Sequence, residues 1–522
     1  MASNAFLVGA GILLSRLSGL VRERVFAHYF GNSDAGDAFK AALKIPNILQ
    51  NLFGEGVLSA SFIPEYAKQI AHGDTREATR LAGVLGTILL LAMALLSVLG
   101  VWATPYLIDW IAPGFHGAKR LLTIDIVRIL FPGTALLVMS AWCLGILNSH
   151  RRFFLSYAAP VIWNVAIIGA MLLFGGVQDL SSLARYTAWG LVVGSGLQLL
   201  VQLPSTLRLV QHLRPSLDLK VQGVRSVLRN FVPVVISRGV VQISAYIDNM
   251  IASLLPTGAV SSLAYAQTLY LLPVSLFGMS VSASELPLLS QAKGSDQEVS
   301  EFLITRINRG LERIAFFVVP SAAAFILLGD FIVGALFQTG QFGARDTNAV
   351  WYVLMGASVG LLATTQSRLY SSAFYSLKDT RTPLRFALVR VTFGIAIGLL
   401  LALKMPQWLG IPPIWGTVGL TVAASIASWV EFVLLRRRFN HRVGLTGMRR
   451  NYQLRVWLAA LFACGAAALV MRFVPLPALH VIIRALIAAA IAGPLYLGLG
   501  LALRLEPAQE LLGKVTRRLR RR

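Results

Sequence analysis

The stretch LFGEGVLSASFIP at residues 52–64 occurs again, one residue shorter, as LFGMSVSASELP at residues 276–287. A second pair of motifs has nearly the same offset of about 223 residues, since Ser15-Arg16 corresponds to Ser237-Arg238. A weaker third pair, LIDWIAPGF from Leu107 and FIVGALFQT from Phe331, has an offset of 224 residues. Chance matches would not share one offset, so the chain contains an internal repeat.

The composition is that of a membrane protein. Hydrophobic residues make up 56% of the chain and charged residues only 13%, whereas soluble domains contain roughly 45–50% and 25%. Apolar runs long enough to cross a hydrocarbon core of about 30 Å recur throughout the chain. With the less pure segments they predict about fourteen transmembrane spans. The first apolar run lacks a cleavage site, so we interpret it as a retained span and not as a signal peptide.

The basic residues follow the pattern expected of membrane topology. The chain has 47 Lys and Arg against 23 Asp and Glu, and most of the basic residues fall in alternate loops and in the C-terminal tail. This positive-inside bias places both termini in the cytoplasm, and the tail KVTRRLRRR against anionic lipid headgroups. No loop is long enough to build a basic surface for nucleic acid, so a nucleic-acid partner is not expected.

The repeat also predicts the architecture. Its copies begin at spans 1 and 7, and a shift of six spans leaves both copies in the same orientation. We therefore predict an all-α polytopic fold of two parallel six-helix repeats plus two C-terminal helices, which is typical of transporters. The predicted domains are an N-terminal lobe at 1–220, a second lobe at 221–440, the two extra helices at 441–505 and a basic cytoplasmic tail at 506–522.

The first two spans carry charges that a lipid-facing helix would not tolerate. An arginine at the bilayer centre costs at least about 2.5–3.5 kcal/mol, and Arg16 is too deep in the first span to reach the headgroups. Seven-residue spacing places Ser15 and Arg22 on one helix face. The second span adds Asp37 and Glu55, and its proline and glycines predict a broken helix. Two interpretations remain open: a water-filled cavity with a net positive wall, or a static network of buried salt bridges.

A cationic pocket in the middle of the membrane favours an anionic cargo. Arginine suits phosphate because its planar guanidinium donates two hydrogen bonds at once. The inside-negative potential assists outward movement of such a cargo by ~2.3 kcal/mol per charge per 100 mV, and the chain contains no ATP-binding motif. Cys143 and Cys464 lie in apolar spans without metal-binding spacing. We therefore expect a transporter and not an enzyme, with no metal and no cofactor.

Several motifs resemble those of one known family. SRLSGLVRE, DAFKAALKIPN, FGEGVLSASFIP, GILNSHRRF and FYSLKDTRTP are similar to the MurJ/MviN lipid II flippases of bacterial peptidoglycan synthesis. The resemblance implies a MATE-like fold in the multidrug/oligosaccharidyl-lipid/polysaccharide exporter superfamily, with a groove for the polyprenyl tail at the last two helices. It also implies lipid II as cargo, the bacterial cytoplasmic membrane as location and the cell-wall synthesis machinery as a partner. The implied site residues are Ser15, Arg16, Arg22, Asp37, Glu55 and Ser261.

The chain departs from the family pattern at three places. The family commonly has Tyr-Ala-Asp-Arg on span 8, whereas this chain has Gln267-Thr268 at the last two positions, and Leu271 replaces a frequent acidic residue. On span 2, Gln50-Asn51 stand where arginine is frequent. The repeat partner of Arg16, Arg238, either replaces the missing charge as a further site residue or pairs with Asp248.

Other functions remain possible on the residues alone. The pocket suits an exporter of another polyprenyl-linked glycan equally well. A cation-coupled drug antiporter of the same fold would favour a net acidic pocket, which the arginines argue against. A membrane glycosyltransferase would need carboxylates or a metal on an outward loop, and a non-transporting scaffold would leave the arginines in the membrane unexplained.

Overall fold

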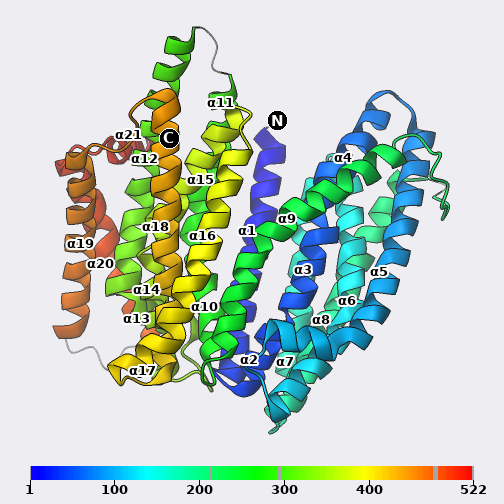
Figure 1. Ribbon diagram of the computed structural model, residues 1–522, viewed down its shortest axis with the longest axis horizontal. Helices are drawn as coiled ribbons and strands as arrows, with labels where there is room; N and C mark the ends of the chain where they lie inside the picture. Colours follow the sequence, from blue (N-terminus) through cyan, green and yellow to red (C-terminus); the bar gives the residue numbers. More distant parts are fainter. Residues whose placement is uncertain (1, 212, 292–294, 474–479, 520–522) are drawn as a thin grey trace. The chain divides into compact units, whose positions relative to one another are not determined.

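The computed structural model describes residues 2–211, 213–291, 295–473 and 480–519, and all elements in these ranges are helices (Figure 1). Some side chains within these ranges are not described, and they include those of Glu55 and Arg238. The chain forms two compact units. Unit 1 comprises residues up to Ser261 together with Thr339–Gln341, and unit 2 comprises Ser262–Gln338 with the residues from Phe342 onward.

Unit 1 contains nine complete helices within the described ranges. They are α1 (Ala2–Phe30), α2 (Asp34–Ala42), α3 (Lys44–Phe53), α4 (Glu55–Ala71), α5 (Thr75–Ile111), α6 (Gly117–Ser149), α7 (Phe153–Phe174), α8 (Leu180–Leu209) and α9 (Val224–Ser253). The unit boundary falls inside the next helix, α10 (Ala259–Pro273). The first turn of α10 therefore belongs to unit 1.

Unit 2 continues α10 through a π-helical segment, Val274–Met279, into α11 (Ser280–Ser290). The other helices are α12 (Asp296–Leu327), α13 (Gly329–Phe337), α14 (Ala344–Ser358), α15 (Leu361–Ser376), α16 (Arg381–Leu399), α17 (Met405–Leu409), α18 (Gly416–Val443), α19 (Arg450–Phe473), α20 (Val481–Ala502) and α21 (Glu506–Leu519). A second π-helical segment, Leu400–Lys404, links α16 to α17, and a short 3-10 helix, Pro413–Trp415, precedes α18.

Ten helices in the described ranges are long and apolar enough to cross a membrane. The bent pair α14 and α15, with an angle of 43° between its halves, raises this number to as many as eleven. Large apolar side chains point outward along these helices; Trp110 is 78% exposed and Leu173 is 81% exposed. Water would disfavour so much exposed apolar surface, whereas lipid accommodates it. The protein is therefore a multi-pass membrane protein, and the count of fourteen spans stays a prediction.

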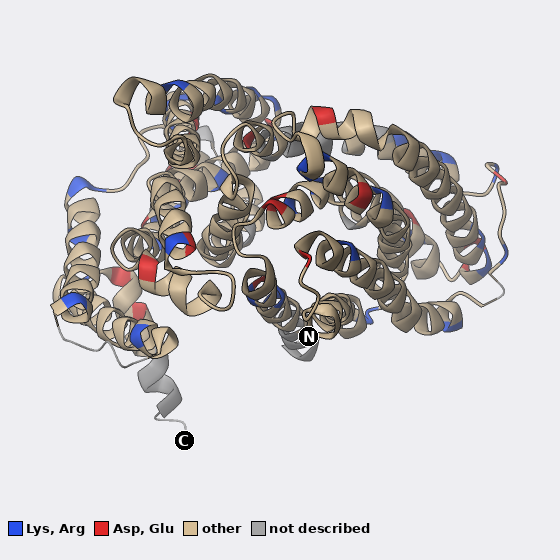
Figure 2. Ribbon diagram, turned by 90° about the horizontal axis from the view of Figure 1, so that it is seen from below, with Lys and Arg blue, Asp and Glu red and all other residues tan. Residues whose placement is uncertain are grey.

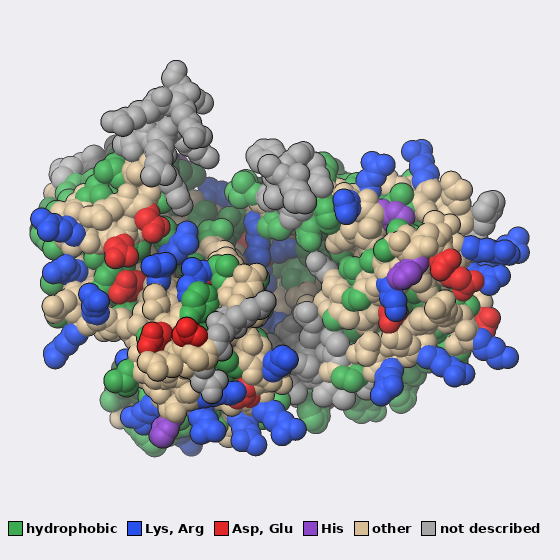
Figure 3. All heavy atoms as spheres, turned by 90° about the horizontal axis from the view of Figure 1, so that it is seen from above, with side chains coloured by type: hydrophobic (Ala, Val, Ile, Leu, Met, Phe, Trp, Pro, Cys, Tyr) green, Lys and Arg blue, Asp and Glu red, His purple; other side chains and the backbone are tan. Residues whose placement is uncertain are grey.

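Charged residues are sparse on the helices, and several acidic segments lie beside basic ones (Figure 2). One end of unit 2 is an exception. The loops that join α15 to α16 and α18 to α19 lie at this end, and residues 436–455 contain seven arginines and no acidic residue. Figure 3 views this end, where Lys and Arg side chains are prominent on the surface of unit 2.

The broken second span is confirmed, and the repeat explains where it breaks. Interruptions at Leu43 and Gly54 divide the segment into α2, α3 and α4. Pro46 sits in the first turn of α3, where its missing N–H leaves no helical bond unmade. Gly278 occupies the position of Gly54 in the second copy of the motif, and it lies in the π-helical segment. Both copies are thus irregular at the same glycine.

Helix α9 belongs to the second copy of the sequence repeat but to the first compact unit of the structure. The repeat makes α9 the first helix of the second copy, and the predicted second lobe accordingly starts at residue 221. In space α9 packs against α3, α4 and α5, all in unit 1. The domain limits at 220 and 440 remain a proposal about the repeat, whereas the compact units change over at Ser261.

The loop within FYSLKDTRTP is fixed by Asp379. Its carboxylate accepts hydrogen bonds from the Thr382 backbone N–H at 3.0 Å and from Thr382 Oγ1 at 2.8 Å, and it pairs with Arg442 of α18 at 3.3 Å. The backbone hydrogen bond from Thr382 holds the pKa of the Asp379 carboxyl below its ordinary value. This local network starts α16 at Arg381 and ties it to the end of α18.

Replacement of Gly54 by alanine should destabilise the protein. A Cβ atom at this position would overlap the carbonyl oxygen of Gln50, so the α3–α4 break would have to shift. We expect a loss of about 1–3 kcal/mol, measured as a lower midpoint of thermal unfolding in detergent. Gly169→Ala on α7 is the matched control, because no described atom lies within 4 Å of the Cβ that alanine would add there. Equal midpoints for the two variants would contradict this explanation.

Candidate functional site

Arg22 of α1 is held by three neighbours on two helices. Its Nη1 donates to Asn164 Oδ1 of α7 at 3.0 Å, and its Nη2 lies 2.8 Å from Glu23 Oε1. Its guanidinium carbon lies 4.9 Å from the ring centroid of Trp163, within cation–π distance. The side chain of Arg22 remains 21% exposed. The guanidinium is therefore fixed in orientation and still accessible on part of its surface.

Glu23 links Arg22 to a buried lysine on α2. The second carboxylate oxygen, Oε2, accepts from Lys40 Nζ, and both side chains are more than nine-tenths buried. Lys40 Nζ also lies 4.2 Å from the ring centroid of Phe26. Two cations share one carboxylate, so this cluster carries one net positive charge. Since Glu23 and Lys40 are enclosed, the excess charge is accessible at Arg22.

Asn164 also connects the Arg22 cluster to the polar face of α1. Its Nδ2 donates to Ser18 Oγ at 2.8 Å, and Ser18 Oγ donates to the Ser15 carbonyl oxygen at 2.9 Å. Ser15 is half-buried, whereas Arg16 is exposed and has no ion pair among the residues that the structure describes. The structure thus brings Ser15 and Arg22 into one hydrogen-bonded network and leaves Arg16 outside it.

Asp37 of α2 is buried and fully engaged in contacts that the sequence did not suggest. Its Oδ2 pairs with Lys119 Nζ of α6 at 2.7 Å and accepts from the Gly258 N–H at 2.8 Å. Its Oδ1 accepts from the Ser261 N–H at 2.8 Å. Its cationic partner in the structure is Lys119 of α6 and not an arginine of α1. Its carboxylate caps the first turn of α10, where backbone N–H groups lack helical partners.

Two further residues complete this capping network. Asp34 Oδ1 lies 2.9 Å from Lys119 Nζ and accepts from Thr257 Oγ1 at 2.8 Å. Ser261 is buried beside Asp37, and its Oγ has no hydrogen-bond partner within the described part of the chain. The predicted residues Asp37 and Ser261 therefore lie together. Glu55 and Arg238 have side chains outside the described residues.

Unit 2 contains a charged group that sequence reasoning missed. Arg390 of α16 lies 3.0 Å from Glu431 of α18, although this ion pair lacks hydrogen-bond alignment. Arg368 of α15 is exposed and close enough to both to interact with their charges. Nearby, Tyr270 donates to Thr364 Oγ1 at 3.0 Å. A signal was present for Arg390 and Glu431, since each stands within an otherwise apolar segment, whereas Arg368 lies among Thr, Gln and Ser residues.

A mostly apolar groove of about 300 Å³ lies along the last two spans in unit 2. It is formed by α12, α13, α19 and α20, and its lining includes Pro320, Ala324, Ile332, Cys464, Ala488 and Tyr496. The lining is mostly apolar, and the resemblance predicts a groove for the polyprenyl tail at these last two helices. Among the described residues no group of three His, Cys, Asp or Glu side chains could hold a metal ion.

Comparisons with known sequences point to one family. A family model described as "Lipid II flippase MurJ" matches residues 26–487. A lipid II flippase MurJ of Burkholderia cenocepacia is 32% identical over 432 residues, which are 81% of this chain and 80% of that protein. A probable lipid II flippase MurJ of Vibrio cholerae is 30% identical over 479 residues, which are 90% and 88% of the two chains.

Solved structures agree in fold. A lipid II flippase MurJ in an inward closed conformation is similar with a TM-score of 0.76 at 23% identity, over 95% of this chain and 99% of that one. A multidrug resistance MATE family transporter of the MOP superfamily, in an inward-facing conformation, has a TM-score of 0.63 at 17% identity, over 82% and 95%. The predicted MATE-like, all-helical fold is confirmed.

Removal of the Asp37 charge should weaken the fold. In Asp37→Asn the amide cannot balance Lys119, whose other carboxylate partner among the described residues is the 60%-exposed Asp34. We expect a loss on the order of 2 kcal/mol, less than for a fully enclosed ion pair, seen as a lower thermal midpoint. Asp109→Asn, which opens the exposed pair with Arg120, is the control and should change the midpoint little. An unchanged midpoint for Asp37→Asn would rule out a stabilising ion pair between Asp37 and Lys119.

Proposed function

The chain belongs to the lipid II flippase MurJ family, and from this premise we propose that it moves lipid II from the inner to the outer leaflet of a bacterial cytoplasmic membrane. It acts as a transporter and not as an enzyme. The observation that carries the proposal is the partly exposed guanidinium of Arg22, which bears the excess positive charge of a buried cluster. A diphosphate headgroup is the complementary anion.

Different groups of the protein suit different parts of the substrate. Arg22, with Arg16 on the preceding turns of α1, attracts the diphosphate, and Ser15 contributes hydrogen bonding on the same face. Unit 2 has cations of its own at Arg368 and Arg390, whereas Thr268 and Asn51 carry no charge. The groove of α12, α13, α19 and α20 accommodates the polyprenyl tail. Glu55, Arg238 and Ser261 remain proposed members of the site.

The driving force follows from the charge of the headgroup. With about two negative charges, outward movement gains about 4–5 kcal/mol per 100 mV of inside-negative potential. The arginine-rich end of unit 2 supports an orientation with the loops at 378–385 and 436–455, and both termini, in the cytoplasm. Alternating access of the two repeats around the bound headgroup is the corresponding transport cycle. Cell-wall synthesis enzymes are the natural partners at either membrane surface.

The alternative exporters are less well supported. A drug antiporter on this fold would need acidic groups for a cationic substrate, whereas the accessible charge at Arg22 is positive. An exporter of another polyprenyl-linked glycan would share the diphosphate and the tail, so only the sugar and peptide distinguish it. The relatives described above are named as lipid II flippases, which favours lipid II.

Arg16→Ala and Arg22→Ala should each abolish transport while leaving membrane insertion intact. Either change removes a guanidinium that binds the diphosphate, and each charge-assisted hydrogen bond is worth ~1.5–3 kcal/mol. The measurement is complementation of cells depleted of their own flippase, with protein in the membrane fraction as the check on insertion. Arg80→Ala, which removes an exposed i,i+3 pair with Glu77, is the control and should complement. Full complementation by Arg16→Ala and Arg22→Ala would remove the basis of the proposal.

Ligand-dependent thermal stability identifies the headgroup. Lipid II should raise the thermal midpoint of the purified protein more than undecaprenyl diphosphate does, because the peptide and both sugars add contacts that bind only the folded protein. Arg22→Ala should reduce the shift caused by both lipids. If another polyprenyl-linked glycan produced the larger shift, the substrate would be that glycan, and the flippase assignment for lipid II would fail.

A further inference from the structure

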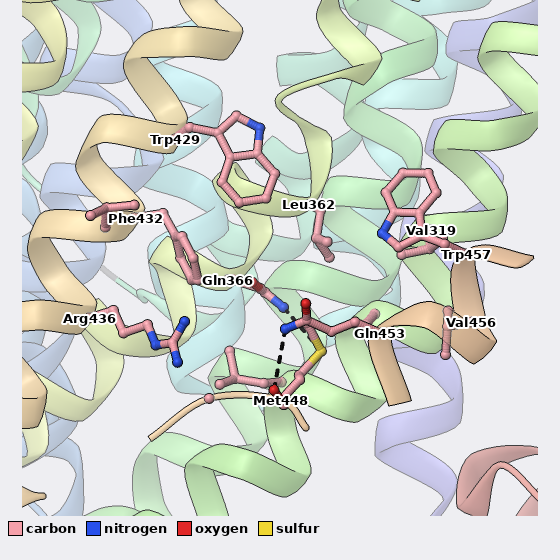
Figure 4. Close-up of a pocket in the computed structure, with 14 residues that line it drawn as sticks. Val319, Leu362, Gln366, Trp429, Phe432, Arg436, Met448, Gln453, Val456 and Trp457 are labelled. Atoms are coloured by element: carbon pink, nitrogen blue, oxygen red, sulfur yellow. Dashed lines mark hydrogen bonds between the residues drawn. The ribbon is translucent and has the colours of Figure 1, made fainter. Parts of the chain in front are cut away.

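Unit 2 contains a second cavity that the transport proposal does not use. It has a volume of about 290 Å³ and lies between α12, α15, α18, the loop before α19 and α19 itself (Figure 4). Its inner wall is buried; Leu311 and Ala315 are 1% exposed and Val456 is fully buried. Its rim is accessible, since Val433 is 38% exposed and Trp457 is half-buried. A molecule can therefore enter from the surface of the unit.

One end of the cavity is apolar. Trp429 and Trp457 face it from α18 and α19, with Leu362 and Val319 between them (Figure 4). The Trp429 indole N–H donates to the Val359 carbonyl at 2.9 Å, which leaves the ring to form the cavity wall. Apart from the Trp457 indole N–H, this end offers hydrocarbon and aromatic surface to an occupant, so it suits an acyl chain.

The other end is cationic. Arg436 of α18 donates through Nε to the Thr446 carbonyl at 2.9 Å, which fixes the guanidinium at the cavity. No carboxylate within the described ranges forms an ion pair with it. Gly447 lies beside it, and a Cβ at this position would overlap the present position of Nη2 of Arg436. A held guanidinium without an acidic partner is a binding group for an anion.

A buried amide adds a second polar group. Gln366 of α15 is 1% exposed, and its Nε2 contacts only the thioether sulfur of Met448, at 3.6 Å, among the described residues. Sulfur is a weak acceptor, so this buried amide has capacity for a better partner. Gln453 of α19 donates to the Met448 carbonyl at 3.3 Å on the same side of the cavity. The amide and the guanidinium thus line one polar end.

The two ends are ordered along the helix axis. Trp429 precedes Arg436 by seven residues, which is about two turns or ~10 Å along α18. The polar end lies toward the segment at 436–455, which comprises the end of α18, the loop after it and the start of α19. This segment contains seven arginines and no acidic residue. The cavity is therefore polar at one end and apolar at the other, in the same order as a lipid at a leaflet surface. The phosphate of such a lipid would lie at the arginines, and its acyl chain would point toward the apolar core.

We propose that this cavity binds one anionic glycerophospholipid, with the phosphate on Arg436 and the start of an acyl chain between Trp429 and Trp457. A free inorganic anion would leave the apolar end empty. The volume is at the lower limit of ligand pockets, roughly 300 Å³, so the cavity encloses part of one lipid and not a whole molecule. The site is separate from the groove of α12, α13, α19 and α20 and is independent of the transported substrate.

Native mass spectrometry of the full-length protein tests the proposal. The protein is mixed with equal amounts of phosphatidylglycerol and phosphatidylethanolamine of identical chains, and the retained lipids are counted. The wild-type protein should retain one phosphatidylglycerol molecule in preference to phosphatidylethanolamine. Arg436→Gln should lose that preference by about tenfold, the loss of one charge-assisted contact. Arg437→Gln, the exposed neighbour on α18 that does not line the cavity, should behave as wild type.

A second variant keeps the test valid if Arg436→Gln does not fold. Ala315→Leu retains the arginine and fills the buried wall of the cavity, and it should reduce retention of both lipids at this site. Equal retention of phosphatidylglycerol by wild type, Arg436→Gln and Ala315→Leu would overturn the proposal. So would displacement of the retained phospholipid by an equimolar polyprenyl diphosphate, because the cavity would then belong to the substrate path.

Discussion

An ionised side chain buried among apolar helices is stabilised by an opposite charge, and this requirement makes neighbours of several helices of the protein. Glu23 joins α1 to α2 through Lys40, Asp37 joins α2 to α6 through Lys119, and Glu431 joins α18 to α16 through Arg390. Leaving one member of such a pair uncompensated costs several kcal/mol, more than most apolar contacts supply. These three carboxylates thus form contacts that position the helices.

The repeat was the most informative feature of the sequence because its motifs are short contiguous stretches that can be compared without knowledge of the fold. Gly54 and Gly278 occupy equivalent places in the motif, and each lies where its helix departs from regular α-helical geometry. Apolar runs and helix breakers are likewise read over short distances, so the all-helical fold and the broken second span were predictable. The boundary of the compact units was not, because the packing of α9 depends on distant helices.

Long-range partners limited the prediction of the site. Asp37 meets Lys119, 82 residues later, and Arg22 meets Asn164, 142 residues later, so no spacing on one helix reveals either contact. The cost of an arginine within a membrane span singled out Arg16. The same argument, applied to unit 2, could have singled out Arg390. Thr268 shows what replaces a family arginine here: its hydroxyl bonds the Ala264 carbonyl of its own helix, which adds no charge to the site.

Asp37 accepts hydrogen bonds from backbone N–H groups in the first turn of α10 only. Beyond Ser261 the helix runs without a break into the π-helical segment, where each N–H bonds to the carbonyl five residues earlier instead of four. This wider winding has weaker geometry than the α-helix on either side. Residues 274–279 are therefore the least regular part of the continuous helix from α10 to α11, whereas its first turn is held by hydrogen bonds to Asp37.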